Sequence, residues 1–165
     1  MEHRCRLEVL MGMIASGKSS YCRKRALEGA IIVNDDAIVT AMHGGNYALY
    51  DKRLKPLYKS LENTAILTAA ALGRDVVVDR PGYSRGQRRR YIGIGKSLDM
   101  QVAVIAFPKQ EPMVHAKRRF KKDSRGRTFE QWLEAAERHA KLWQTPNGET
   151  EGFDLLLNID SFNAQ

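Results

Sequence analysis

The stretch Gly12-Met13-Ile14-Ala15-Ser16-Gly17-Lys18-Ser19 decides the fold of this chain of 165 residues. It fits the phosphate-binding pattern G-x-x-x-x-G-K-[ST], and an apolar run from Leu7 to Met11 that reads as a strand precedes it. Small residues let main-chain N–H groups turn towards phosphate oxygens, and the helix that follows directs its positive end at them. The sequence therefore predicts a nucleoside triphosphate site rather than an ordinary glycine-rich turn.

The pattern also assigns roles within the loop. Lys18 is expected to neutralise charge on the outer phosphates, and the Ser19 hydroxyl is expected to hold Mg²⁺. Ala15 stands where many such loops carry another glycine, which narrows the freedom of the loop. We expect the following residues to contact ATP or another nucleoside triphosphate: Gly12, Met13, Ile14, Ala15, Ser16, Gly17, Lys18, Ser19 and Ser20.

Length and composition favour a single domain, residues 1–165. A hydrophobic fraction of 43% is typical of a soluble globular protein, and no apolar run is long enough to cross a bilayer, so we expect no membrane partner. No secretory signal is expected at the N-terminus, and two cysteines are too few for a disulfide framework. These features indicate the cytoplasm, or the host cytoplasm if the chain is phage-encoded. The oligomeric state stays open.

Strand and helix patterns alternate along the chain. Beyond the first strand, further strands are expected at 30–33, 76–78, 101–107 and 153–159. Helices are expected at 18–28, 50–72, 85–98, 112–122 and from 128 onwards, with Pro56 either starting or kinking the second of them. Two capping boxes support the assignment, Ser84 with Gln87 and Thr128 with Gln131. The alternation predicts an α/β fold of three layers, with a parallel sheet of about five strands covered by helices on both faces.

Carboxylates follow two of the predicted strands, at the sheet edge where parallel α/β proteins bind ligands. We assign Asp35 as the base that accepts the proton of an acceptor hydroxyl, in preference to Asp36, because two adjacent carboxylates seldom both point into one site. Asp36 suits the alternative role of helix N-cap before Ile38. Asp79 follows three valines and could hold Mg²⁺ through water or orient the acceptor.

Basic residues form two groups, within a net charge of +8 that favours a polyanionic partner without proving one. Arginines bracket the loop in residues 117–128, as a lid that closes over polyphosphate requires, and we expect two of the four to reach the phosphates: Arg118, Arg119, Arg125 and Arg127. The lysines there, Lys117, Lys121 and Lys122, read as a solvated face. A second group could either contact the backbone phosphates of an acceptor or simply form an exposed basic helix: Arg85, Arg88, Arg89 and Arg90.

Aromatic and histidine side chains are less informative. Tyr47, Tyr50 and Tyr83 could stack on a base, although tyrosines at helical spacing are more often core or rim residues. The four histidines lie without ligand spacing, so we expect no metal site besides that of Mg²⁺.

Taken in order, several segments resemble the kinase domain of phage-type polynucleotide 5′-hydroxyl kinases and their P-loop kinase relatives. The resemblance rests on the phosphate loop, on Val33-Asn34-Asp35-Asp36, on Val78-Asp79, on the arginine-bearing lid and on Glu151-Gly152-Phe153-Asp154. It implies the P-loop kinase fold and transfer of the γ-phosphoryl group of ATP to the 5′-hydroxyl end of DNA or RNA.

The resemblance also implies the roles of individual residues. Lys18 and Ser19 bind the phosphates and Mg²⁺, Asp35 is the general base, and Asp79 is the acidic residue after the third strand. Arg119 and Arg125 act in catalysis from the lid, and with Arg118 they contact the nucleotide. We expect the acceptor to meet Asp35, Asp36, Asp79, Arg80, Arg85 and Arg89.

Two departures from the family leave alternatives open. The relatives carry an arginine three residues past the base, where this chain has Ile38, and the lid arginines are more widely spaced here. A P-loop kinase with a nucleoside, nucleotide or other metabolite as acceptor is therefore the second hypothesis. The third is a nucleotide-binding module without phosphotransfer. The sequence contains no phosphatase domain, so we expect any end-healing role to stop at adding phosphate.

Overall fold

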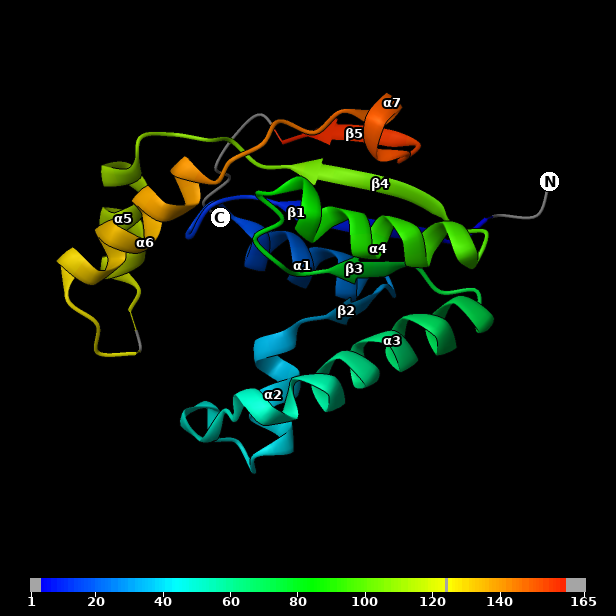
Figure 1. The fold of residues 1–165 in the computed structure, drawn as a ribbon, viewed down its shortest axis with the longest axis horizontal. Coiled ribbons are helices and arrows are strands. Elements are labelled where there is room, and N and C mark those ends of the chain that lie inside the picture. Colours follow the sequence, from blue (N-terminus) through cyan, green and yellow to red (C-terminus); the bar gives the residue numbers. More distant parts are fainter. Residues whose placement is uncertain (1–3, 124, 160–165) are drawn as a thin grey trace.

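The computed structural model describes residues 4–123 and 125–159, so the two ends of the predicted domain and Ser124 of the predicted lid lie outside the described residues. Its sheet has five parallel strands in the order β2-β3-β1-β4-β5 (Figure 1). The strands are β1 (Arg6–Met11), β2 (Ile31–Val33), β3 (Val76–Val78), β4 (Gln101–Ala106) and β5 (Leu155–Asn158). The predicted parallel sheet of about five strands is confirmed.

The helices fill the intervals between the strands. They are α1 (Lys18–Leu27), α2 (Asp35–Met42), α3 (Lys55–Ala71), α4 (Arg85–Ser97), α5 (Pro112–Lys121), α6 (Phe129–Lys141) and α7 (Gly148–Glu151). Two 3₁₀ turns, η1 (Tyr47–Leu49) and η2 (Lys52–Leu54), lie between α2 and α3. The helix predicted from residue 50 begins only at Lys55, because Pro56 fits the first helical turn, where no N–H partner is needed.

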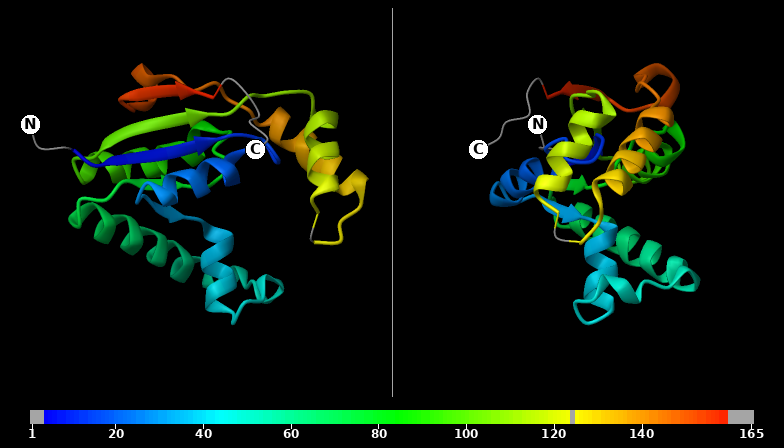
Figure 2. Two further views of the ribbon diagram at one scale, coloured as in Figure 1. Left: turned by 180° about the vertical axis from the view of Figure 1, so that it is seen from behind. Right: turned by 90° about the vertical axis from the view of Figure 1, so that its left-hand side faces the viewer.

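The central strand β1 supplies both faces of the core. Leu7 and Val9 pack with Ile66 of α3 and Tyr91 of α4, whereas Leu10 packs on the opposite face with Cys22 of α1. This alternation is the two-residue period of a strand that is buried on both sides. Helices α3 and α4 thus cover one face and α1 the other, which gives the three predicted layers (Figure 2).

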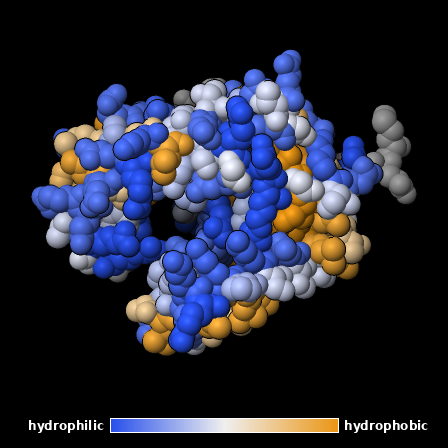
Figure 3. All heavy atoms as spheres, viewed as in Figure 1, coloured by the Kyte–Doolittle hydropathy of each residue, from blue (hydrophilic) through white to orange (hydrophobic). Residues whose placement is uncertain are grey.

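The helices α5 and α6 extend beyond the carboxyl ends of the strands as a separate hairpin (Figures 1 and 2). Ala116 and Trp132 of this hairpin pack against Met13 of the phosphate loop. The segment from α2 to the start of α3 projects on the other side of the same sheet edge, and a hollow bordered by hydrophilic residues separates it from the hairpin (Figure 3). The sheet edge expected to bind ligands therefore lies between two projecting elements.

The predictions of helix starts from neighbouring residues were largely correct. Both capping boxes form, at Ser84–Gln87 and at Thr128–Gln131. The assignment of Asp36 as N-cap is wrong, because the side chain of Asn34 accepts the hydrogen bond from the Ala37 N–H (2.8 Å) and Asp35 already belongs to the first turn. Both aspartates therefore lie at the positive end of α2, where negative charge is stabilised.

Among the residues that the structure describes, none of the helices combines the length and apolar character needed to cross a bilayer.

Candidate nucleotide and acceptor site

The phosphate loop has the backbone that its glycines predict. A Cβ at position 12 would lie 2.3 Å from Oγ of Ser16 and 3.0 Å from Cβ of Phe107, so a side chain there would force the buried Ser16 to move. Gly17 adopts a φ of 104° as the N-cap of α1. Ala15 also has a left-handed φ, 51°, which is unfavourable for a residue with a side chain. Ala15, which stands where many such loops carry a glycine, is therefore a position of backbone strain.

Lys18 lies across the mouth of this loop. Its Nζ donates hydrogen bonds to the carbonyl oxygens of Gly12 (2.8 Å) and Met13 (2.7 Å). Burial lowers the pKa of Lys18 to about 8, against the opposing charge of Asp79. An ammonium group held by two carbonyls is ready to exchange them for phosphate oxygens, because an anion would relieve the cost of burying the charge.

A cavity of about 640 Å³ opens over the loop. It is lined by the loop residues Ile14 to Ser20 and by four cations, namely Arg23, Arg118, Arg119 and Lys122. Of the four candidate lid arginines, Arg118 and Arg119 thus lie on the cavity that contains the phosphate loop. The sequence analysis missed Arg23, although it lies one helical turn beyond Ser19. Lys122 is exposed, as predicted, and it also lines this cavity.

Aromatic stacking holds part of the lid. The guanidinium groups of Arg119 and Arg127 lie 4.7 and 4.9 Å from the ring centroid of Trp132 on α6. Cation–π contacts of this kind restrain long arginine side chains that would otherwise sample many rotamers. Arg119 is therefore held at the cavity by the hairpin itself.

A buried histidine ties the hairpin to the loop. The ring of His115 on α5 contacts the Ile14 carbonyl oxygen through Nδ1 (2.9 Å), and its Nε2 accepts from the Gln110 N–H (3.2 Å). Burial lowers the pKa of His115, so the neutral ring serves as donor to Ile14. No spacing pattern could have predicted this contact, which joins residues about a hundred positions apart.

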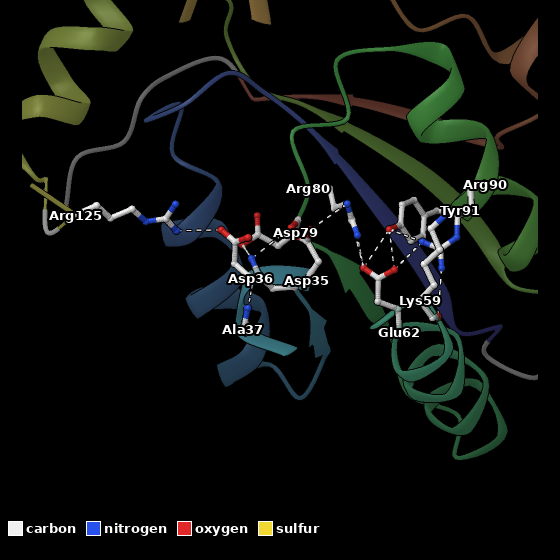
Figure 4. Close-up of polar contacts among 11 residues, drawn as sticks. Asp35, Asp36, Ala37, Lys59, Glu62, Asp79, Arg80, Arg90, Tyr91 and Arg125 are labelled. Atoms are coloured by element: carbon white, nitrogen blue, oxygen red, sulfur yellow. Dashed lines mark hydrogen bonds and ion pairs between the residues drawn. The ribbon is translucent and has the colours of Figure 1, made fainter. Parts of the chain in front are cut away.

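Arg125 takes a different position from the cavity arginines. Its Nη2 donates to Oδ2 of Asp36 (3.0 Å; Figure 4). Its Cζ lies 5.4 Å from the ring centroid of Tyr47. The hairpin loop therefore reaches across to the segment that follows β2.

Asp35 lies beside an arginine that is itself held by a buried carboxylate. Nη1 of Arg80 is 3.1 Å from Oδ2 of Asp35, and Nη2 of Arg80 is 2.7 Å from Oε1 of the fully buried Glu62 (Figure 4). Burial raises the pKa of Asp35, the charge of Arg80 opposes the rise, and Asp36 and Glu62 add to it. A carboxylate with a raised pKa is a better proton acceptor than an ordinary aspartate.

Asp79 lies between this group and the phosphate loop. Its Oδ2 accepts from Nδ2 of Asn34 (2.9 Å), and its charge acts on both Lys18 and Cys22, whose thiol pKa burial raises to about 12. Ser19 and Asp79 supply the hard oxygen donors that Mg²⁺ prefers. The described residues hold no group of three or more His, Cys, Asp or Glu side chains placed to bind a metal.

The second basic group does not form one surface. Arg88 is fully buried and makes a bidentate ion pair with Glu151, 2.7 and 2.6 Å. Arg90 donates to Glu62 (2.6 Å). Both earlier interpretations are wrong for Arg88, which can neither contact an acceptor nor belong to an exposed helix face. Arg85 and Arg89 are exposed on α4.

The three tyrosines considered for base stacking do not lie together in the structure. Tyr47 and Tyr50 are 39% and 40% exposed, and their rings stack. Tyr83 instead packs on the ring of His139, with centroids 4.7 Å apart.

A parallel sheet in this order, with a glycine-lined loop between β1 and α1, defines a P-loop protein with the kinase fold. The chain belongs to the AAA domain family, whose sequence model matches residues 7–142. No curated protein sequence matches significantly.

Solved structures with the same fold include proteins with different activities. One chain of the Pnkp1/Rnl/Hen1 RNA repair complex has a TM-score of 0.66 at 16% identity, covering 87% of this chain and 48% of its own length. A putative kinase from Chloroflexus aurantiacus J-10-fl has a TM-score of 0.66 at 15% identity, with 95% and 88% covered. The Mycobacterium tuberculosis APS kinase CysC, solved with AMPPNP and APS, has a TM-score of 0.58 at 16% identity, with 97% and 92% covered. The present chain thus spans less than half of the RNA repair protein, and these likenesses establish the fold.

Proposed function

We propose that this protein is an ATP-dependent kinase that phosphorylates the 5′-hydroxyl ends of DNA or RNA. One observation carries the proposal: Asp35, with its raised pKa and its Arg80 partner, lies at the same sheet edge as a phosphate loop surrounded by lid cations. A base for an alcohol and a cradle for a triphosphate are the two parts that phosphoryl transfer requires.

In the proposed reaction, Asp35 accepts the proton of the 5′-hydroxyl as its oxygen attacks the γ-phosphorus. The new O–P bond forms as the bond to the β-phosphate oxygen breaks, and ADP leaves. Lys18, Arg118 and Arg119 neutralise the charge that spreads over the phosphate oxygens. Ser19 and Asp79 would hold Mg²⁺, which supplies further charge neutralisation when bound. Asn34 fixes the orientation of the Asp79 carboxylate.

Charge supports a polynucleotide as acceptor. The formal net charge is +8, and Arg80 presents a guanidinium directly beside the proposed base. Arg85 and Arg89, exposed at the start of α4, are available for backbone phosphates further along a strand. The fold likeness to a chain of an RNA repair complex points the same way.

The direct test offers the purified protein ATP, Mg²⁺ and an oligonucleotide with a free 5′-hydroxyl. We expect transfer of the γ-phosphoryl group to the oligonucleotide and no transfer to the same oligonucleotide carrying a 5′-phosphate. Failure to phosphorylate DNA and RNA ends alike would reject the proposal.

A small-molecule kinase is the second candidate, and Ile38 favours it. This side chain packs against the core formed by β1, β3 and α3, so α2 presents no arginine where the polynucleotide kinases carry one. The APS kinase shows that the fold also serves small acceptors. Salt discriminates the two: the KM for a polynucleotide should rise steeply with ionic strength, and that for a neutral metabolite should barely change.

A further inference from the structure

We propose that the stacked pair Tyr47 and Tyr50 is the platform on which the base of the acceptor's terminal nucleoside stacks, and that Arg125 occupies this platform in the ligand-free protein. The inference rests on the proposed function and specifies its substrate as an acceptor whose hydroxyl belongs to a nucleoside. It also assigns Arg125 a role that acceptor binding controls.

The platform is built outward from the core. Tyr58 on α3 is buried, and its hydroxyl lies 2.7 Å from Nε2 of His43. Tyr50 stacks on Tyr58 with ring centroids 5.8 Å apart, and Tyr47 stacks on Tyr50 at 6.2 Å with planes only 16° apart. Three rings in sequence thus end in an exposed one. A stack of this kind fixes the outermost ring, because each plane is held by the plane beneath it.

The outermost ring lies next to the proposed base. Arg125 bridges Tyr47 and Asp36, with its guanidinium 5.4 Å from the Tyr47 ring centroid and 3.0 Å from Oδ2 of Asp36, and burial together with the charges of Asp36 and Asp35 raises the pKa of Tyr47. Asp35 and Asp36 are consecutive residues in the first turn of α2. A base stacked at Tyr47 would therefore keep its sugar within reach of Asp35.

Arg125 occupies the position that a base would take. Its guanidinium is planar, lies 5.4 Å from the Tyr47 ring centroid and is neutralised by Asp36 at 3.0 Å. Guanidinium planes and nucleobases use aromatic rings in the same way. An incoming base would displace Arg125 from Tyr47 and release a lid cation that can then turn towards the phosphates. Acceptor binding would thus complete the lid.

A purely structural role for the tyrosine stack accounts less well for the exposure of Tyr47 and Tyr50. Tyr47 and Tyr50 remain 39% and 40% exposed, in the segment between α2 and α3 that borders the hollow (Figure 3). A neutral metabolite without a ring system would gain little from two parallel aromatic faces. A nucleobase offers a π face whatever its identity, so the platform fits ends of any sequence.

The experiment compares two oligonucleotides that differ only at the 5′-terminal nucleotide, which is normal in one and abasic in the other. Both carry the 5′-hydroxyl. We expect the wild-type protein to prefer the normal end in kcat/KM by about 5- to 150-fold, the range that one stacked base contributes. Tyr47→Leu should bring this ratio close to one by slowing the reaction of the normal end, and Tyr47→Phe, which keeps the ring, should retain most of it.

Arg125→Ala tests the displacement separately. Because the acceptor no longer has to displace a guanidinium, its KM should fall several-fold, and kcat should also fall because the lid loses the cation that turns towards the phosphates. A higher acceptor KM in this variant would show that Arg125 itself binds the acceptor and would overturn the displacement.

The outcomes separate this inference from the proposed function. Equal rates on normal and abasic ends by the wild-type protein, or a Tyr47→Leu variant that keeps the full preference, would overturn the stacking platform and leave the kinase activity intact. Phosphorylation of neither oligonucleotide would instead reject the polynucleotide kinase itself. The wild-type ratio decides even if Tyr47→Leu does not fold.

Discussion

Nη1 of Arg80 lies 3.1 Å from Oδ2 of Asp35, across the boundary between β3 and α2. The other side of the same guanidinium is held by Glu62, which is buried on α3 and also bonded to Arg90. Arg80 therefore cannot turn away from Asp35 without leaving a buried carboxylate short of a partner. This places a fixed positive charge beside the proposed base, in the turn that follows β3.

Replacing Asp35 by asparagine should lower kcat for phosphoryl transfer by about 10²- to 10⁴-fold, the usual contribution of a general base. ATP affinity should change little, since Asp35 does not line the phosphate cavity. Asp36→Asn is the matched control, with a smaller effect on kcat. Comparable losses in the two variants would contradict the assignment of Asp35, and retention of full activity in Asp35→Asn would favour a nucleotide-binding module.

Removing Arg80 should move the acid limb of the pH–rate profile to higher pH. Asp35 acts as a base only when ionised, so activity falls as the pH drops through its pKa, which burial has already raised. The charge of Arg80 opposes that rise, and Arg80→Ala should therefore raise the pKa further. The measurement is kcat/KM against pH. The control is Arg53→Ala, which removes an exposed charge from η2 and should leave the acid limb of the profile unchanged. A shift of the acid limb to lower pH in Arg80→Ala would contradict the role of Arg80 in lowering the pKa of Asp35.

The local chemistry of this chain was readable from its sequence, whereas contacts between distant segments were not. The five strands and both capping boxes depend on neighbouring residues, and their positions along the chain were predicted correctly to within about two residues. Asn34 was overlooked as N-cap because Asp36 also suited that role. The contacts of Glu62 with Arg80 and of Arg125 with Tyr47 depend on how α3 and the hairpin fold back onto the sheet edge. Neither periodicity nor composition encodes those distances.

ATP binding should be accompanied by proton uptake near pH 8. The pKa of Lys18 is lowered to about 8 in the ligand-free protein, so about half of the molecules carry a neutral amine at that pH. Phosphate oxygens favour the ammonium form, and binding should therefore take up about half a proton per ATP. Calorimetry in buffers of different ionisation enthalpy measures this number. Lys18→Met should abolish the uptake, and an unchanged value in that variant would assign it to another group.

Loss of Arg88 should affect stability rather than substrate binding. Arg88 is fully buried, pairs with Glu151 and donates to the Gly82 carbonyl oxygen at 2.8 Å. Removing one partner of a buried ion pair leaves the other charge uncompensated, so Arg88→Ala should lower the free energy of unfolding by about 3–5 kcal/mol. Its exposed neighbour provides the control, since Arg89→Ala should change stability by about 0.5 kcal/mol or less. Urea denaturation of both variants makes the comparison, and equal midpoints would contradict the burial of Arg88.

Ala15→Gly should stabilise the ligand-free protein, although glycine usually destabilises. Ala15 has a φ of 51°, and the left-handed region costs a residue with a Cβ about 1–2 kcal/mol. Glycine relieves this strain, but it also increases the conformational entropy of the unfolded chain, which lowers the stability by about 0.4–1 kcal/mol. The net gain, up to about 1.6 kcal/mol, should raise Tm by up to about 6 °C for a domain of this size. Ala65→Gly, in the middle of α3, is the matched control and should lower Tm, because its backbone is helical and glycine there brings the entropic cost and loses a Cβ that packs against the core. A lower Tm in both variants would mean that the loop relaxes away from the left-handed conformation in solution.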